Sequence, residues 1–274
     1  MKRAIKLILY YLGYQLLFIF LATGIDATIT LISGGEVTTD FRPDTMAISI
    51  GMLLSTLAMT WHLVHFNYVR FSKENIYEVS KKVILLCIPL LLSAQFIAGI
   101  LNEALDLTDT NQELFISMSH NIFGVISIAI AVPILEELLF RGAIEGHLLR
   151  KGWSPKWAII ISALIFGLIH GNPAQIPFAF LIGLLFGWLY YRTGSLIPGI
   201  AGHIINNSFG AWTMFTATKE ELSQTTMETL GTTATYILLL LAIVIFTGIY
   251  FYLNKYLLKP TSIIETIDKQ DSTI

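Results

Sequence analysis

Three charged side chains interrupt a long apolar stretch in the middle of the chain. Glu136, Glu137 and Arg141 follow a mostly apolar run at 122–135, and further apolar residues come after them. A charged side chain at the centre of a membrane helix costs about 2.5–3.5 kcal/mol on insertion scales. Three such residues so close together therefore indicate either a network of partners or a chemical task.

The spacing of these residues assigns them different directions. Glu137 and Arg141 stand four residues apart with the acid first, which favours an ion pair on one helix face. Adjacent residues of a helix point about 100° apart, so we expect Glu136 to face a cavity instead. Pro133, one turn earlier, is expected to kink the helix and expose backbone groups beside the site. The simpler alternative is an ion pair that only locks two helices together.

Two later apolar segments each contain a histidine at helical spacing from another side chain. Phe166 and His170 share one face, before Gly171 ends the helix, and His203 shares a face with Asn207. Taken singly, His170 could be a satisfied core histidine, and the His203–Asn207 pair could be a polar contact between helices. We interpret the three motifs together as one buried polar site.

This set of side chains suits hydrolysis without a serine or cysteine nucleophile. Glu136 could take a proton from a water molecule that a neighbouring histidine holds in place. His203 and Asn207 could donate hydrogen bonds to the oxyanion that forms when water attacks a peptide carbonyl. Two histidines and one carboxylate are also a zinc ligand set, here Glu136, His170 and His203. The residues alone do not separate a glutamate-activated water from a zinc-activated one.

The composition places these motifs in a membrane protein. The chain has 274 residues, of which 54% are hydrophobic and 13% are charged, whereas soluble domains carry about 25% charged residues. The net charge of −2 gives no indication of nucleic acid binding. The single cysteine, Cys87, cannot form an internal disulfide. The apolar stretch that follows Lys2 and Arg3 is too long for a typical signal peptide and fits a membrane anchor better.

A helix needs about 20 apolar residues to cross a bilayer. On this basis we predict an all-α fold, a polytopic membrane helical bundle with about eight transmembrane helices. The predicted spans are 4–24, 46–69, 83–101, 117–140, 157–171, 174–191, 196–216 and 234–254. The fourth is expected to continue as helix toward Arg150. The predicted parts are N-terminal helices at 1–116, a catalytic core at 117–216, a C-terminal helix at 217–254 and a polar cytoplasmic tail at 255–274.

The loops between these spans alternate in charge, and cytoplasmic loops are enriched in Lys and Arg. The alternation therefore predicts that both termini face the cytoplasm. The basic residues are Lys2, Arg3, Lys6, Arg70, Lys73, Lys81, Lys82, Arg150, Lys151, Lys156, Arg192, Lys255 and Lys259. The acidic residues of the alternate loops are Asp26, Glu36, Asp40, Glu103, Asp106, Asp109, Glu113, Glu220, Glu221 and Glu228.

Measured from these basic loops, the three motifs could lie at a similar depth. With a rise of about 1.5 Å per residue, Glu136 lies about 21 Å before Arg150, and His170 lies about 21 Å after Lys156. His203 lies about 16 Å after Arg192. The predicted topology thus allows the three polar groups to meet.

The motifs Glu136-Glu137-xxx-Arg141, Phe166-xxx-His170 and His203-xxx-Asn207 resemble those of a known family. It is the family of CAAX-processing and bacteriocin-processing intramembrane endopeptidases, also called the Abi or type II CAAX prenyl endopeptidase family. The resemblance covers roughly 117–212, with all three motifs in order and at the family's internal spacing.

The resemblance implies a helical membrane protease that cuts membrane-associated peptides or proteins near the cytoplasmic side. By motif position, Glu136 resembles the general base, supported by Glu137 and Arg141. His170 resembles the water-positioning histidine, and His203 and Asn207 resemble the oxyanion-stabilising pair. Many members are classed as metalloproteases, but a metal-free glutamate mechanism has been proposed for the fold, and we favour that version without a cofactor.

The family also suggests a setting, and the sequence leaves two rival functions. The compact form is typical of bacterial members, which are associated with bacteriocin maturation, self-immunity or surface-protein processing, and a bacterial plasma membrane is expected. One rival is a proton-coupled transporter, since buried Glu and His residues also form proton relays. The other is a non-catalytic immunity or scaffold protein that uses only the fold.

Overall fold

The computed structural model describes residues 1–38, 41–69, 79 and 81–257. Over these ranges the secondary structure is helical, with no strand, which confirms the predicted all-α membrane bundle. Six helices are long and apolar enough to cross a membrane. They are α1 (Lys2–Ile32), α2 (Thr45–His65), α3 (Lys81–Glu103), a continuous helix over Ile122–Arg150, α9 (Gln175–Thr193) and α13 (Thr232–Tyr256).

Two further apolar helices match the other predicted spans. Helix α8 (Pro155–Ile169) has 15 residues, fewer than the about 20 that a perpendicular crossing requires. Helix α10 (Ile197–Thr216) has 20 residues but carries His203, Asn206 and Asn207 in its middle. The total of eight crossings and the boundaries of the four parts of the chain stay predictions. Of the predicted tail, 258–274 lies outside the described residues.

The fourth predicted span begins later than expected. Residues 117–119 belong to a separate short helix, α4 (Gln112–Ser119), and the long helix begins at Ile122. Asn121 produces this break, because its side chain caps the new helix by accepting a hydrogen bond of 2.7 Å from the backbone N–H of Gly124. The predicted continuation of the helix to Arg150 is confirmed.

This long central helix changes its hydrogen-bond register twice. The α-helical segments α5 (Ile122–Ile126), α6 (Val132–Glu136) and α7 (Gly146–Arg150) alternate with the π-helical segments η1 (Ser127–Ala131) and η2 (Glu137–Glu145). π-Helical turns are rare and often mark functional sites. Here the two π segments flank α6, so that Glu136 ends α6 and Glu137 begins the second π segment.

Pro133 accounts for one consequence of the first π segment. The backbone N–H of Val132 bonds to the carbonyl of Ser127, five residues back. In that register the carbonyl of Ile128 would need a donor at position 133, but proline has no N–H. The Ile128 carbonyl is therefore left for a partner outside the helix, as expected from a proline one turn before Glu136.

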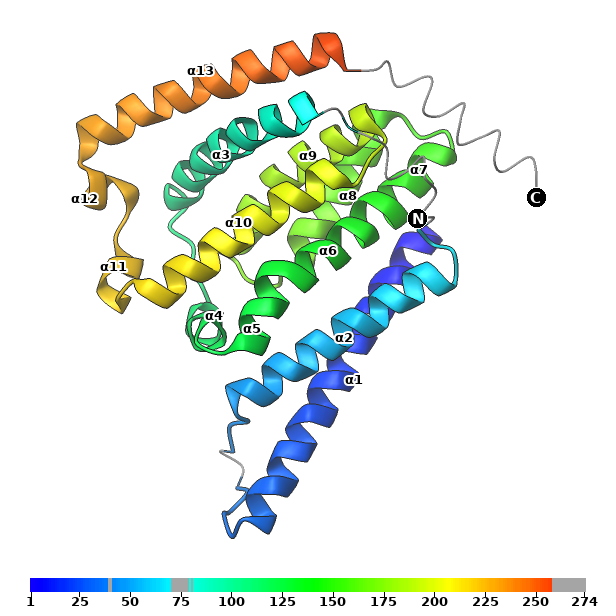
Figure 1. Ribbon diagram of the computed structural model, residues 1–274, viewed down its shortest axis with the longest axis vertical. Helices are drawn as coiled ribbons and strands as arrows, with labels where there is room; N and C mark the ends of the chain where they lie inside the picture. The colour runs from blue at the N-terminus through cyan, green and yellow to red at the C-terminus, as the bar shows by residue number, and fades with distance from the viewer. Residues whose placement is uncertain (39–40, 70–78, 80, 258–274) are drawn as a thin grey trace.

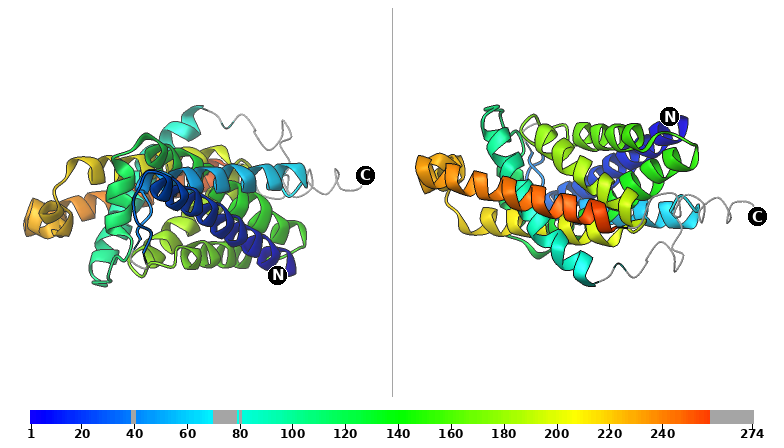
Figure 2. Two further views of the ribbon diagram at one scale, coloured as in Figure 1. Left: turned by 90° about the horizontal axis from the view of Figure 1, so that it is seen from below. Right: turned by 90° about the horizontal axis from the view of Figure 1, so that it is seen from above.

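The central helix occupies the middle of the bundle (Figures 1 and 2). Helices α1 and α2 pack as one pair beside it, α8 and α9 as a second pair, and α3 and α13 as an outer pair. In the most apolar 18-residue window of the central helix, 61% is buried inside the protein, whereas the corresponding share is 0% for α1 and 11% for α13. The central helix is thus shielded from lipid, while α1 and α13 expose their side chains to it.

A core of aliphatic and aromatic side chains fixes this arrangement. Leu138, Leu139 and Phe140 of the central helix are at most 2% exposed and pack in one cluster with Leu7 of α1 and Phe166 of α8. In a membrane, such side chains stabilise the bundle through close van der Waals packing against one another. The polar residues that follow in the chain are therefore held by a rigid apolar frame.

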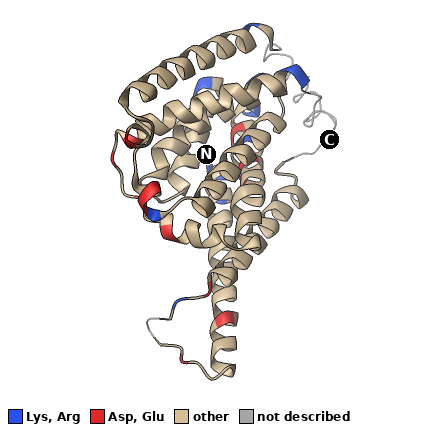
Figure 3. Cartoon of the chain, turned by 60° about the vertical axis from the view of Figure 1, so that its left-hand side comes forward, with Lys and Arg blue, Asp and Glu red and all other residues tan. Residues whose placement is uncertain are grey.

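Charges separate toward the two ends of the bundle (Figure 3). Most Lys and Arg residues lie toward the end that holds the start of α1 and the end of α13. Several acidic residues lie at the other end, around α11 (Lys219–Ser223) and α12 (Thr226–Leu230). This separation agrees with the predicted alternation, and placing the basic end in the cytoplasm stays a prediction. Asp40, Arg70, Lys73 and Lys259 lie outside the described residues.

Candidate active site

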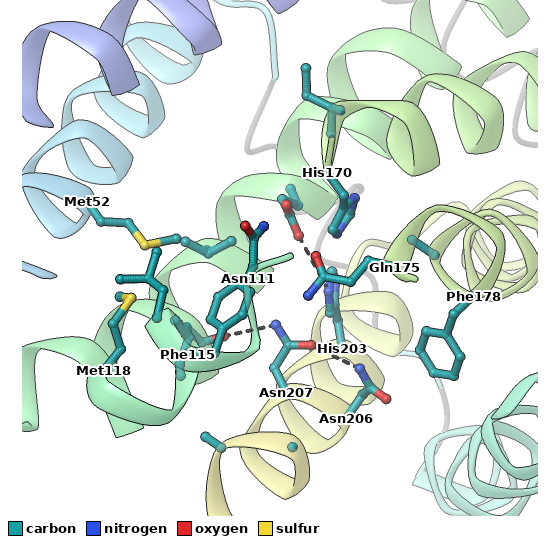
Figure 4. Close-up of a pocket in the computed structure, with 18 of the residues that line it drawn as sticks. Met52, Asn111, Phe115, Met118, His170, Gln175, Phe178, His203, Asn206 and Asn207 are labelled. Atoms are coloured by element: carbon teal, nitrogen blue, oxygen red, sulfur yellow. Dashed lines mark hydrogen bonds and ion pairs between the residues drawn. The ribbon is translucent and has the colours of Figure 1, made fainter. Parts of the chain in front are cut away.

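A cavity of about 530 Å³ lies beside the central helix (Figure 4). Its walls come from α1, α2, α4, α8, α9 and α10 as well as from the central helix. Glu136, His170, His203 and Asn207 all line it, so the structure brings these four predicted site residues together. The cavity has a size typical of ligand pockets, which span about 300–1,000 Å³.

Glu137 and Arg141 lie behind the cavity wall and form the expected ion pair. Arg141 donates from Nη1 to Oε1 of Glu137 over 2.8 Å, and each side chain is 1% exposed. Nη2 of Arg141 also donates to the carbonyl of Gly183 over 3.1 Å. The guanidinium lies 4.5 Å from the centre of the Phe166 ring and 5.3 Å from that of Phe186. Arg141 therefore ties the central helix to both α8 and α9.

His203 lies between the two glutamates. Its Nδ1 is 3.0 Å from Oε1 of Glu137, and its Nε2 is 3.5 Å from Oε2 of Glu136. Both ring nitrogens thus face carboxylate oxygens, and Nδ1 lies within hydrogen-bond distance of Glu137. Gly199, one turn before His203, permits this approach, because a Cβ there would come within 2.7 Å of Oε2 of Glu137.

His170 is oriented by its own helix. Its Nδ1 lies 2.8 Å from the carbonyl oxygen of Phe166, so Nδ1 carries the proton and donates it to this acceptor. In the neutral ring, Nε2 then has a free lone pair, which can accept a hydrogen bond from a molecule in the cavity. Gly171 ends α8 directly after His170 with a positive φ of 62°, which a glycine adopts without strain.

Asn207 is held by two hydrogen bonds. Its Nδ2 donates to the free carbonyl of Ile128 over 2.9 Å, and its Oδ1 accepts from Nδ2 of Asn206 over 2.9 Å. These contacts fix which side of the amide bears the nitrogen. Because Nδ2 carries two protons, one remains for a group in the cavity. The Ile128 carbonyl that Pro133 leaves without a helical donor therefore positions Asn207.

The structure adds residues that sequence reasoning treated as structural or did not single out. Asn206, which the sequence marks only as a packing or interhelix hydrogen-bond residue, lines the cavity and donates a hydrogen bond to Asn207. Asn172 is fully buried and its Nδ2 donates to Oδ1 of Asp109 over 2.7 Å, while its Oδ1 accepts from the backbone N–H of Thr110 over 3.1 Å. It thus fastens the loop before α4 onto the turn that carries His170. The sequence could have revealed Asn172 through its position two residues after His170.

Glu145 is a further buried acid of the central helix. It is 0% exposed, and within the described residues neither carboxyl oxygen has a hydrogen-bond partner. Gly187 of α9 makes room for it, because a Cβ there would lie 2.7 Å from Oε2 of Glu145. The spacing could have revealed it, since Glu145 follows Arg141 by one helical turn on the same face.

The zinc alternative can be compared with this geometry. Among the described residues, no three His, Cys, Asp or Glu side chains are grouped so as to hold a metal ion. Nδ1 of His203 faces Glu137, and Nε2 lies 3.5 Å from Oε2 of Glu136.

Comparison with known proteins finds a sequence family similar to the segment that holds this site. Residues 118–209 match the family model described as type II CAAX prenyl endopeptidase Rce1-like. All six predicted site residues fall inside that segment. No solved structure matches the chain.

Three curated bacterial proteins are similar to parts of the chain. YdiL of Bacillus subtilis is 35% identical over 85 residues, covering 31% of this chain and 34% of YdiL. The UPF0177 protein YxdF of Lactococcus lactis is 30% identical over 122 residues, covering 44% of this chain and 63% of YxdF. MroQ of Staphylococcus aureus, named a membrane-embedded CAAX protease, is 34% identical over 106 residues, covering 37% of this chain and 42% of MroQ.

The matches thus span between a third and just under two thirds of the length of these relatives. The family model covers the motif-bearing residues, and it confirms the resemblance drawn from the three motifs. Residues 118–209 of this chain are thus similar to the Rce1-like type II CAAX prenyl endopeptidase family.

Proposed function

We propose that the chain is an intramembrane endopeptidase that hydrolyses peptide bonds with a water molecule activated by Glu136. The observation that carries this proposal is the shared cavity, which Glu136, His170 and His203 line together. A carboxylate with two imidazoles in a restricted space has the groups needed to deprotonate water and to stabilise the resulting oxyanion. The match of this segment to a peptidase family supports the same reaction class.

In this mechanism Glu136 removes a proton from water while the water oxygen attacks the peptide carbonyl carbon. Nε2 of His170 accepts a hydrogen bond from the same water and directs it. The carbonyl oxygen becomes an oxyanion, to which Nε2–H of His203 and the remaining Nδ2–H of Asn207 donate. When the carbon–nitrogen bond breaks, the proton on Glu136 passes to the leaving amine.

Glu137 and Arg141 act as positioning residues in this scheme. Glu137 accepts from Nδ1 of His203 and so keeps the other ring nitrogen directed toward the cavity. Arg141 holds Glu137 and balances its charge. Since removal of a base or of an oxyanion donor typically costs about 10²–10⁴ in rate, small displacements of His203 should be costly.

The metal-free version is the one we propose, and it is supported by the absence, among the described residues, of three His, Cys, Asp or Glu side chains grouped to hold a metal ion. A membrane-associated peptide or protein is the proposed substrate, and a bacterial plasma membrane the proposed location. Roles in bacteriocin maturation or self-immunity would follow from the identity of that substrate. Comparative proteomics of membrane peptides, in cells carrying the wild type or Glu136→Ala, is the way to find it.

The test is cleavage of membrane peptides by the purified full-length protein in liposomes, read by mass spectrometry. We expect Glu136→Gln to lower the cleavage rate at least about 100-fold, because the amide cannot accept the proton. Glu220→Gln serves as the control, since Glu220 is exposed and lies on α11. Equal cleavage by the wild type and Glu136→Gln would refute the assignment of the base. Ion flux that depends on Glu136 without hydrolysis would favour a transporter, and a phenotype that survives Glu136→Gln would favour a non-catalytic protein.

A further inference from the structure

The cavity contains more polar side chains than the hydrolytic mechanism uses. Four carboxamides line it besides Asn207: Gln15 of α1, Asn111 just before α4, Gln175 of α9 and Asn206 of α10. They come from four separate parts of the chain. Figure 4 shows Asn111, Gln175 and Asn207 directed toward the same space below His170.

Two of these carboxamides make no side-chain hydrogen bond within the described chain. Asn111 precedes α4 without capping it through its side chain, and Gln175 is the first residue of α9. Within the described chain, neither side-chain amide has a hydrogen-bond partner, whereas most partly buried amides find one. Gln15 differs, because it hydrogen-bonds with the side chain of Tyr11. Asn111 and Gln175 therefore offer free donors and acceptors to a molecule in the cavity.

The remaining lining is apolar or uncharged. Among the described residues that line the cavity there is no Lys, Arg or Asp, and Glu136 is the single Glu. Met52, Met118 and Met214 contribute flexible thioethers from three different helices. Methionine side chains adapt to varied apolar partners. The cavity thus combines uncharged polar groups with a surface that fits many apolar side chains.

We infer that Gln15, Asn111 and Gln175, with Asn206, form a subsite that holds the main chain of an unwound, uncharged substrate segment beside the scissile bond. This inference rests on the proposed peptidase function and specifies its substrate class. The subsite recognises the peptide backbone through amide groups, and the substrate side chains through apolar contact.

The physical reason lies in the state that a substrate must adopt. A membrane peptide is helical because each unpaired backbone N–H or C=O costs several kcal/mol in lipid. Hydrolysis requires at least one peptide group to leave that helix and meet Glu136. A carboxamide carries the same donor and acceptor groups as a peptide bond and has no charge. Carboxamides around the site therefore replace the hydrogen bonds that unwinding removes.

Charge selectivity follows from the same lining. An acidic substrate side chain would leave water for a lining that, among the described residues, holds no Lys or Arg to pair with it. An asparagine of nearly the same shape would meet carboxamide partners instead. The subsite should therefore accept Asn and reject Asp at one position near the scissile bond.

The experiment measures binding, so that it does not depend on turnover. The probes are two fluorescent Leu/Ala membrane peptides whose central Gly-Ala-Xaa-Ala segment carries either Asn or Asp at Xaa. Each is titrated into the full-length Glu136→Gln protein in lipid nanodiscs. We expect the Asn probe to bind at least about tenfold more tightly than the Asp probe, since leaving a charge unpaired costs more than a tenfold change in affinity requires.

The subsite itself is tested in the same background by Gln15→Leu, Asn111→Leu and Gln175→Leu. Each should weaken binding of the Asn probe about threefold to tenfold, the range expected for one lost hydrogen bond. Gln224→Leu is the matched control, because Gln224 is exposed in the segment between α11 and α12. This variant should bind the Asn probe with unchanged affinity. Where a leucine variant loses thermal stability, the unbranched Gln175→Met or Gln15→Met takes its place.

The outcomes separate this inference from the proposed function. Equal affinity for the Asn and Asp probes, unchanged affinity in the three leucine variants, or no binding of the Asn probe each overturns the subsite. Carboxamide-dependent binding without any cleavage by the wild type supports the subsite and rejects the peptidase. Cleavage by the wild type with carboxamide-independent binding keeps the peptidase and rejects the subsite.

Discussion

Removing Arg141 should destabilise the protein more than removing the whole buried pair. Arg141 and Glu137 are each 1% exposed and lie 2.8 Å apart. Arg141→Met leaves the Glu137 carboxylate buried with His203 as its one charged or ionisable partner at that oxygen. Breaking a buried pair from one side typically costs about 3–5 kcal/mol, whereas replacing both partners by apolar residues is often close to neutral.

The assay is unfolding in detergent micelles, followed for Arg141→Met, Glu137→Leu and the double variant. We expect Arg141→Met to lose about 3–5 kcal/mol and the double variant to recover at least about 1 kcal/mol of that loss. Arg141→Met and the double variant should both be inactive in peptide cleavage, because His203 loses its orientation. If the two single effects simply add, or if Arg141→Met is as stable as the wild type, the buried charges do not form the network described here.

Three further outcomes test the surroundings of the site. Gly199→Ala should reduce cleavage about 10- to 100-fold, because the added Cβ would displace Glu137. The control Gly248→Ala should not reduce it, because a Cβ there would meet no atom within 4 Å. Equal cleavage rates in the two variants would contradict this prediction. Asn172→Ala should lower the free energy of unfolding by about 1–3 kcal/mol through its lost hydrogen bonds to Asp109 and the Thr110 backbone; calorimetry in micelles checks this, and no shift would count against it. Purified protein should contain far less than one zinc per chain and cleave equally with a chelator present; loss of cleavage on chelation would instead support the zinc version.

The sequence carried enough information for the polar site because the membrane makes such residues conspicuous. Charged and amide side chains are costly in lipid, so Glu136, His170 and His203 stand out in apolar segments and have few arrangements open to them. Helical spacing then separated Glu136, which lines the cavity, from Glu137, which pairs with Arg141. The fold class followed from composition for the same reason.

Other features depended on three-dimensional contacts that periodicity does not encode. The break before Ile122 arises from one capping asparagine, Asn121, in a stretch that otherwise reads as continuous helix. The role of His203 as a bridge between two carboxylates depends on how closely α10 approaches the central helix at Gly199. Gln175 and Asn111 can be recognised as cavity-lining residues only once the fold brings their distant segments together.

The π-helical register links several of these features into one cause. Pro133 cannot supply the N–H that the Ile128 carbonyl would receive in a π turn, and this carbonyl is therefore free to accept from Asn207. In an unbroken α-helix without proline, the same carbonyl would be paired within the helix, and Asn207 would need another acceptor or would remain unpaired in an apolar setting. The irregularity that would normally weaken a membrane helix thus provides the contact that fixes an amide beside Glu136. The proline and the second asparagine, Asn206, are therefore better understood as parts of the site than as features of packing.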